Sequence, residues 1–201
     1  MIVAVEGIDG AGKRTLVDAL VEPLAAHTLA FPRYDDSAAA QLAQAALNGR
    51  MGDLTDSAHG MAALFALDRH GAVDTLARYA GNPDETVILD RYAASNAAYT
   101  WARTGEEASL AWVEDLEFGR LGLPKPDLQV LVDTPPAVAS ERAARREADD
   151  ETRVRDRYER DAGLQRATYA AYVALAERSW ASPWLVSSDA AVIIEAVAAL
   201  R

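Results

Sequence analysis

The chain has 201 residues, a formal net charge of −11 at pH 7 and no cysteine. Half of its residues are hydrophobic, which is enough for a sizeable core, and we expect one domain over residues 1–201. The acidic balance argues against a broad nucleic-acid-binding face. No apolar run approaches the ~20 residues of a membrane span. Without cysteine the sequence has no disulfide or thiolate metal site. We therefore expect a cytoplasmic protein with neither a membrane nor a nucleic-acid partner.

The first residues predict a phosphate-binding P-loop. A short strand over about residues 2–6, apolar through Val5, leads into the pattern G-x-x-x-x-G-K from Gly7 to Lys13, and a helix should follow. Glycines there let backbone N–H groups surround phosphate oxygens, and the helix N-terminus adds partial positive charge. The alternative without a function is a tight strand-to-helix turn that happens to hold three glycines and a lysine. Because the match lies between an expected strand and an expected helix, we favour the P-loop. The expected ATP-binding residues are Gly7, Gly10, Ala11, Gly12, Lys13, Arg14 and Thr15.

The P-loop departs from its pattern at one position. Arg14 stands where a Ser or Thr normally binds magnesium, and Thr15 supplies a hydroxyl one residue late, about 100° further around the helix. Either the metal is held elsewhere or Arg14 supplies part of its charge. Asp9 lies inside the loop, where a carboxylate repels phosphates unless it binds a cation or a substrate hydroxyl. Asp9 is therefore a candidate metal or sugar ligand.

Two later segments predict further site residues at strand ends. A strand over about 28–31 runs into Phe31-Pro32-Arg33-Tyr34, and the carboxyl ends of parallel strands are where ligands bind. A buried strand over about 86–90 ends in Asp90, which is typical of a Walker B carboxylate near magnesium, and Arg91 follows it. The next segment looks helical and carries Ser95, Asn96 and Tyr99, although exposed helices also carry such residues.

Two long helices carry less decisive signals. One should run from Thr55 or Ser57 to about Tyr79, with Phe65 and Arg69 on one face. From spacing alone, Asp68 and Arg69 are equally well explained as a surface ion pair. The other helix, over 106–121, is amphipathic, and we expect it to serve packing or a partner interface and no chemistry.

An arginine-rich stretch over about 142–156 predicts a lid. Arg142, Arg145 and Arg146 share one helix face, and Arg153 and Arg155 follow a charged run without apolar residues. Such a run is usually a solvated loop. Beside a P-loop, a lid that brings arginines to a transferring phosphoryl group is the favoured alternative. A long helix should then extend from Arg157 to about residue 180.

The order of elements predicts an α/β fold. Strands at about 2–6, 28–31, 86–90, 128–133 and 184–187 alternate with helices, and a closing helix follows from residue 189. This alternation is typical of a five-stranded parallel sheet with helices on both faces.

Taken together, these motifs resemble those of bacterial thymidylate kinases. The match is carried by residues 7–15, by Phe31-Pro32-Arg33-Tyr34, by residues 65–69, by Asp90-Arg91-Tyr92 with residues 95–99, and by residues 156–161. They occur in order over nearly the whole chain, and the sequence is closest to the branch of the family with Arg after the P-loop lysine.

The resemblance implies a P-loop NTPase fold of the nucleoside monophosphate kinase type, with an arginine-bearing lid. It implies transfer of the γ-phosphoryl of ATP to dTMP, giving dTDP and ADP, with Mg²⁺ as cofactor. It also implies a homodimer, formed through helices of the type that carry Leu64 and Val113. Catalysis would then be positioning and electrostatics without a strong general base.

The resemblance also implies individual roles. Phe31 would stack on thymine, Arg69 would bond its exocyclic oxygen, Asn96 would meet its N3 edge, and Tyr158 would reject ribonucleotides. The full dTMP set is Asp9, Phe31, Arg33, Tyr34, Phe65, Arg69, Arg91, Ser95, Asn96, Tyr99 and Tyr158. The expected metal ligands are Asp9, Glu159 and Asp90, and the catalytic set is Lys13, Arg14, Asp9, Arg91, Arg142, Arg146 and Arg153.

Three alternatives remain. Another P-loop nucleoside monophosphate kinase or a deoxynucleoside kinase would share the fold. A GTPase-like switch would need an N-K-x-D motif, and Lys125-Pro126-Asp127 is not one. The third alternative is a purely structural ATP-binding partner protein, which only a measurement of enzymatic activity can exclude.

Overall fold

The computed structural model describes residues 1–149 and 155–201. Its centre is a five-stranded sheet in the order β2-β3-β1-β4-β5, and every pairing is parallel. The strands are β1 (Ile2–Glu6), β2 (His27–Ala30), β3 (Val87–Asp90), β4 (Leu128–Leu131) and β5 (Trp184–Val186). The predicted α/β fold with a parallel sheet is confirmed, and no strand end differs from its expected position by more than two residues.

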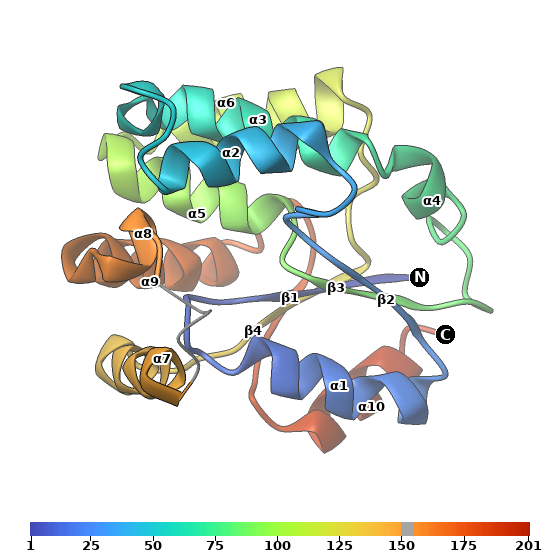
Figure 1. Cartoon of the computed structure of the whole chain (residues 1–201). Helices are drawn as coiled ribbons and strands as arrows, with labels where there is room; N and C mark the ends of the chain where they lie inside the picture. Colours follow the sequence, from blue (N-terminus) through green and yellow to red (C-terminus); the bar gives the residue numbers. More distant parts are fainter. Residues whose placement is uncertain (150–154) are drawn as a thin grey trace.

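Helices cover both faces of the sheet. In Figure 1, α1 and α10 lie on one side of the strands, and α2, α3, α5 and α6 lie on the other. The main helices are α1 (Lys13–Leu24), α2 (Ala38–Leu47), α3 (Ala58–His70), α4 (Val73–Ala77), α5 (Ala93–Thr104), α6 (Ser109–Glu114), α7 (Pro136–Asp149), α8 (Arg157–Arg160), α9 (Ala162–Glu177) and α10 (Ala190–Ala198), with short helical turns η1 (Leu54–Asp56) and η2 (Asp115–Arg120). None of the described helices is long and apolar enough to cross a membrane.

The central strand β1 shows why its first four residues are all apolar. Val3 and Val5 join the larger core cluster, which also contains side chains of α1 and α10, whereas Ile2 and Ala4 join a second cluster with Phe31. Successive side chains of a strand point to opposite faces, and a parallel sheet is buried on both. The strand therefore needs apolar residues at every position until it reaches the site.

Three predicted helices differ from expectation in their bounds or continuity. The helix expected over 57–79 ends at His70, and a Cβ at Gly71 would lie 2.5 Å from Nη2 of Arg33. The helix expected over 157–180 divides at Asp161, whose side chain caps α9 by accepting from the backbone N–H of Leu164 at 2.9 Å. The helix expected over 106–121 begins at Ser109 and continues from α6 into the π-helical η2.

The two residues named for the expected dimer helices differ in exposure. Val113 on α6 is fully buried in the protein's own core, so a partner could meet this helix only through its other side chains. Leu64 on α3 is only half-buried and packs against a small cluster that contains Tyr158.

The strand ends and the loops that follow them build one edge of the sheet. The P-loop leaves β1 there, and Thr134, after β4, donates to the backbone oxygen of Ala11 at 2.8 Å. The start of α7 comes so close that a Cβ at Gly10 would lie 2.1 Å from the backbone oxygen of Ala139. In an open α/β sheet, ligands bind outside the carboxyl ends of the strands, and this edge is where the site lies.

Candidate active site

Two adjoining cavities lie at the carboxyl ends of the strands. The smaller encloses about 180 Å³ and contacts α3, α5 and α8. The larger encloses about 860 Å³ between the P-loop and α7. Asp9, Phe31, Arg91 and Glu159 line both cavities. A group bound in one cavity can therefore meet a group bound in the other beside these four side chains.

The larger cavity has the features of a P-loop. Gly7, Gly10 and Gly12 adopt positive φ angles of 147°, 82° and 104°, which glycine tolerates and which turn the backbone around the loop. The buried Nζ of Lys13 donates to the backbone oxygens of Gly7 at 3.0 Å and Ile8 at 2.9 Å. Burial, followed by the charge of Arg91, lowers the pKa of Lys13 to about 8. The ammonium group of Lys13 is thus held within the loop.

Arg14 and Thr15 line the same cavity but are exposed. The guanidinium of Arg14 pairs with Asp18 one helical turn away, at 3.2 Å. Exposed pairs of this kind bind weakly, so the arginine can turn to a phosphate at little cost.

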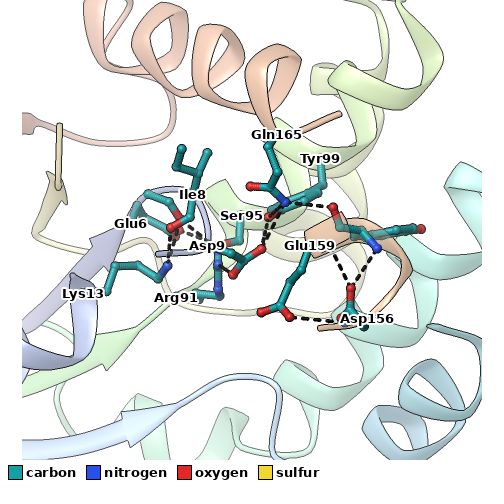
Figure 2. A network of polar contacts seen from close by, with 12 residues as sticks. Glu6, Ile8, Asp9, Lys13, Arg91, Ser95, Tyr99, Asp156, Glu159 and Gln165 are labelled. Atoms are coloured by element: carbon teal, nitrogen blue, oxygen red, sulfur yellow. Dashed lines mark hydrogen bonds and ion pairs between the residues drawn. The ribbon is translucent and has the colours of Figure 1, made fainter. Parts of the chain in front are cut away.

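Arg91 is the central cation of the site (Figure 2). Its side chain pairs with Asp9, and its Nη1 donates to the backbone oxygen of Gly7 at 3.0 Å and to Oγ of Ser95 at 3.1 Å. Its backbone has a φ of 68°, a left-handed conformation that costs a residue other than glycine roughly 1–2 kcal/mol. Functional sites are where such strain is commonly kept.

Glu6 explains how Arg91 keeps this conformation. Its carboxylate, at the end of β1, is fully buried and accepts from the backbone N–H of Tyr92 at 2.8 Å, from Ser95 Oγ at 2.6 Å and from Tyr172 Oη at 3.1 Å. Burial raises the pKa of Glu6. The sequence reasoning missed this residue, although an acidic residue closing an otherwise apolar buried strand was the available signal.

Asp9 faces the arginine from the P-loop side. Its second oxygen accepts from Tyr99 Oη at 2.7 Å and from Gln165 Nε2 at 3.2 Å, as Figure 2 shows. Burial on its own would raise the pKa of Asp9, but the charges of Arg91 and Lys13 outweigh it and hold the pKa well below its usual range. Asp9 is therefore a carboxylate at neutral pH. Gln165 was not predicted, although it lies in α9 only four residues after the motif over residues 156–161.

The far end of the smaller cavity is lined by Arg69 and Asn96. The interpretation of Asp68 and Arg69 as a surface ion pair is wrong, because only 0% and 3% of their surfaces are exposed. Arg69 pairs with Glu117, and Asp68 pairs with Arg33 at 3.1 Å. The expectation of no chemistry in residues 106–121 missed Glu117. Its spacing of four from the buried Val113 could have indicated an inward side chain.

Aromatic residues form the remaining walls of the smaller cavity. Phe31 is buried and packs beside Tyr92 at 6.1 Å between ring centroids, whereas Phe65 and Tyr34 are only half-buried. Tyr99 and Tyr158 stack with centroids 5.9 Å apart. Every residue of the expected dTMP set lines this cavity except Arg33, whose side chain turns to Asp68.

Asp156 fixes the position of Tyr158 and Glu159. Its side chain accepts hydrogen bonds from both of their backbone N–H groups, at 2.8 and 2.9 Å. In return, the side chain of Glu159 accepts a hydrogen bond from the backbone N–H of Asp156 at 3.2 Å. This reciprocal capping box starts α8 at the mouth of the cavity.

The predicted lid is described only in part. Its first residues belong to α7, from which Arg142, Arg145 and Arg146 line the larger cavity, and Arg142 Nη1 donates to the backbone oxygen of Ala11 at 3.3 Å. Arg153 lies outside the described residues. The arginine-rich face over the P-loop is therefore present in α7.

The expected metal ligands are spread around the junction of the cavities. Asp9 and Glu159 line both, and Asp90 lines the larger. Burial, and then the charges of Asp9 and Asp156, raises the pKa of Glu159. Within residues 1–149 and 155–201 no three His, Asp or Glu side chains form a metal cage. Mg²⁺ commonly takes one or two carboxylates together with phosphate oxygens and water, and this donor set fits that mode.

Comparison with known proteins agrees with this geometry. A family model described as thymidylate kinase matches residues 5–197. A thymidylate kinase of Mycobacterium tuberculosis is 53% identical over 194 residues, which cover 92% of this chain and 90% of that protein. One of Xanthomonas euvesicatoria is 38% identical over 80% of this chain and 68% of its own length. A probable thymidylate kinase of Thermococcus onnurineus is 31% identical over 89% of this chain and 85% of its own length. The chain belongs to the thymidylate kinase family.

Proposed function

We propose that the chain phosphorylates dTMP to dTDP with ATP, with the nucleotides bound in the two adjoining cavities. The observation that carries this assignment is the meeting of the cavities at Asp9, Phe31, Arg91 and Glu159. Phosphoryl transfer requires the donor and acceptor phosphates to approach each other against their repulsion, and a shared wall that carries a half-buried arginine favours that approach.

ATP would occupy the larger cavity. Backbone N–H groups of the P-loop would surround its phosphates, and Lys13 would exchange its two backbone oxygens for phosphate oxygens. Arg14, Arg142 and Arg146 line this cavity and would neutralise charge on the transferring group. Arg153 belongs to the same expected set and lies outside the described residues.

The nucleoside of dTMP would occupy the smaller cavity, with its phosphate toward Arg91. Arg69 and Asn96 at the far end would meet the base, and Phe31 and Phe65 would flank it, Phe65 with more of its ring open. Tyr99 and Tyr158 would flank the sugar, where Tyr158 would exclude a 2′-hydroxyl. Tyr34 and Ser95 would complete the pocket. Arg33 would reach the acceptor phosphate only by leaving Asp68.

Magnesium would bind at the junction of the cavities. Asp9 would serve as a ligand or bind the 3′-hydroxyl, with Glu159 and Asp90 completing the donor set around phosphate oxygens. The metal would supply charge neutralisation between the two phosphates. The chain's own part is to hold the carboxylates ionised and in place, which Arg91 and Lys13 do for Asp9.

A homodimer in the cytoplasm is part of the proposal. Leu42 on α2 and Leu67 on α3 are 44% and 49% exposed, and these helices pack against each other, so they leave apolar surface open to a partner. A strictly monomeric species in sedimentation at micromolar concentration would contradict the dimer.

The test is ADP release from ATP and magnesium with dTMP, dUMP, dCMP, AMP and thymidine offered in parallel. Lys13→Ala should lower turnover by about 100-fold or more, because it removes a charge aimed at the transferring group. Lys125→Ala is the matched control, since Lys125 is a surface lysine paired with Glu114. Turnover led by dTMP and lost only in Lys13→Ala supports the assignment. Turnover led by another acceptor would favour the alternative monophosphate or deoxynucleoside kinases.

A further inference from the structure

The end of the smaller cavity that Arg69 and Asn96 line is organised by a buried acid, Glu117, which does not itself line the cavity. Glu117, in η2, is fully buried. Its Oε2 accepts from Nε of Arg69 at 2.8 Å, and its Oε1 accepts from Arg69 Nη2 and from Asn96 Nδ2, the latter at 2.7 Å. One carboxylate therefore orients both polar groups of this end of the cavity.

The contacts determine which way the Asn96 amide points. Its Nδ2 donates to Glu117 and also to the backbone oxygen of Ala62 at 3.0 Å, which uses both of its N–H groups. The reversed amide would place Oδ1 against these two acceptors. Asn96 therefore keeps Oδ1 as the atom that is free to accept a hydrogen bond from a ligand.

The same carboxylate sets the direction of Arg69. Two of its five N–H groups are bound to Glu117 in a bidentate pair. Within residues 1–149 and 155–201, its other N–H groups and Oδ1 of Asn96 have no hydrogen-bond partner. Since Arg69 and Asn96 both line the cavity, they present an N–H donor beside an oxygen acceptor.

We propose that Glu117 is a specificity-determining positioning residue for the base, an inference that rests on the proposed phosphorylation of dTMP. Thymine and uracil carry an N3–H donor beside the O4 acceptor, which complements this arrangement. Cytosine carries an N3 acceptor beside an amino donor. Its N3 would face the acceptor Oδ1 of Asn96, and its amino group would face an N–H donor of Arg69, so neither position could form a hydrogen bond. A site whose buried polar groups are left unpaired rejects the wrong ligand strongly.

The charge of Glu117, and not only its size, is required. A glutamine at this position has one oxygen and one N–H₂ group. At the position of Oε2 its N–H₂ would face the Nε donor of Arg69, and at the position of Oε1 it would face the donors of both Arg69 and Asn96. Either arrangement loosens the pattern that the cavity presents to the base.

The experiment compares Glu117→Gln with Glu114→Gln. Both change the same residue type in neighbouring turns, but Glu114 forms only an exposed pair with Lys125 at 2.8 Å. Steady-state constants are measured for dTMP, dCMP and ATP. In Glu117→Gln we expect the ratio of kcat/KM for dTMP over dCMP to fall by about tenfold or more, as loss of one charge-assisted hydrogen bond implies. KM for dTMP should rise while KM for ATP stays within about twofold.

The outcomes separate the inference from the proposed function. Wild-type protein without dTMP-dependent turnover contradicts the proposed function itself. Turnover of dTMP with an unchanged dTMP-to-dCMP ratio in Glu117→Gln overturns the role of Glu117 alone, as does a wild type that accepts both nucleotides equally. A merely structural role would lower both activities in proportion. If Glu117→Gln does not fold by circular dichroism, Glu117→Asp keeps the charge on a shorter side chain. Its ratio must then also fall, and an unchanged ratio refutes the inference.

Discussion

Replacing Asp68 by asparagine tests whether the loop after β2 is held to α3 by a buried charge. Asp68 accepts from the backbone N–H of Arg33 at 3.0 Å and from its Nε at 3.1 Å, and the two side chains are 1% and 15% exposed. Asparagine preserves the shape but turns one acceptor into a donor. One N–H of Arg33 then faces another N–H, and the guanidinium loses its counter-charge.

The expected loss follows from the burial of the pair. Removing one partner of a fully buried pair costs about 3–5 kcal/mol, and losing a single charge-assisted hydrogen bond costs about 1.5–3 kcal/mol. Because the Arg33 side chain is 15% exposed, it can still reach water, and the lower range applies. We expect the free energy of unfolding to fall by roughly 2–3 kcal/mol, and Tm by roughly 4–12 °C for a chain of this size.

Urea unfolding and a thermal scan measure both quantities. Asp18→Asn is the matched control, because the exposed pair of Asp18 with Arg14 should leave the unfolding midpoint unchanged. A double-mutant cycle with Arg33→Gln should give a coupling energy of about 1 kcal/mol or more. If Asp68→Asn proves as stable as Asp18→Asn, or if the cycle shows no coupling, the argument from burial is refuted.

Two further predictions follow from the P-loop. Gly10→Ala should destabilise the protein by roughly 2–4 kcal/mol and abolish ATP binding, because at a φ of 82° its Cβ would lie 2.1 Å from the backbone oxygen of Ala139. Gly49→Ala is the matched control. Gly49 has a φ of 73° and no atom within 4 Å of a Cβ, so this change should cost only the backbone strain, about 1 kcal/mol. Urea unfolding of wild type and Asp9→Asn over a range of pH, with a chelator present, tests Asp9, whose pKa is held low by Arg91 and Lys13. The stability lost in Asp9→Asn should be complete above about pH 4 and should shrink as the pH falls toward the folded-state pKa. An equal effect of both glycine changes, or a pH-independent gap between wild type and Asp9→Asn, would contradict these two predictions.

Local patterns in the sequence were sufficient for the P-loop and for the parallel sheet. The strand, the glycines and Lys13 are contiguous, so their geometry depends on backbone preferences of neighbouring residues. The same holds for Asp90 and Arg91 at the end of β3. These residues lie together because parallel strands end at one edge, which the alternation of strands and helices implies.

The partners of the charged residues were decided only by the tertiary structure. Arg33 meets Asp68 across 35 residues, and Arg69 meets Glu117 across 48 residues. No periodicity within a helix indicates such a pairing, and by spacing alone Asp68 and Arg69 read equally well as a solvated pair. Burial removes water from these groups, so each must be satisfied by whatever the fold brings within reach. The sequence by itself determined which chemistry the site holds, whereas packing between distant elements determined which acid orients each cation.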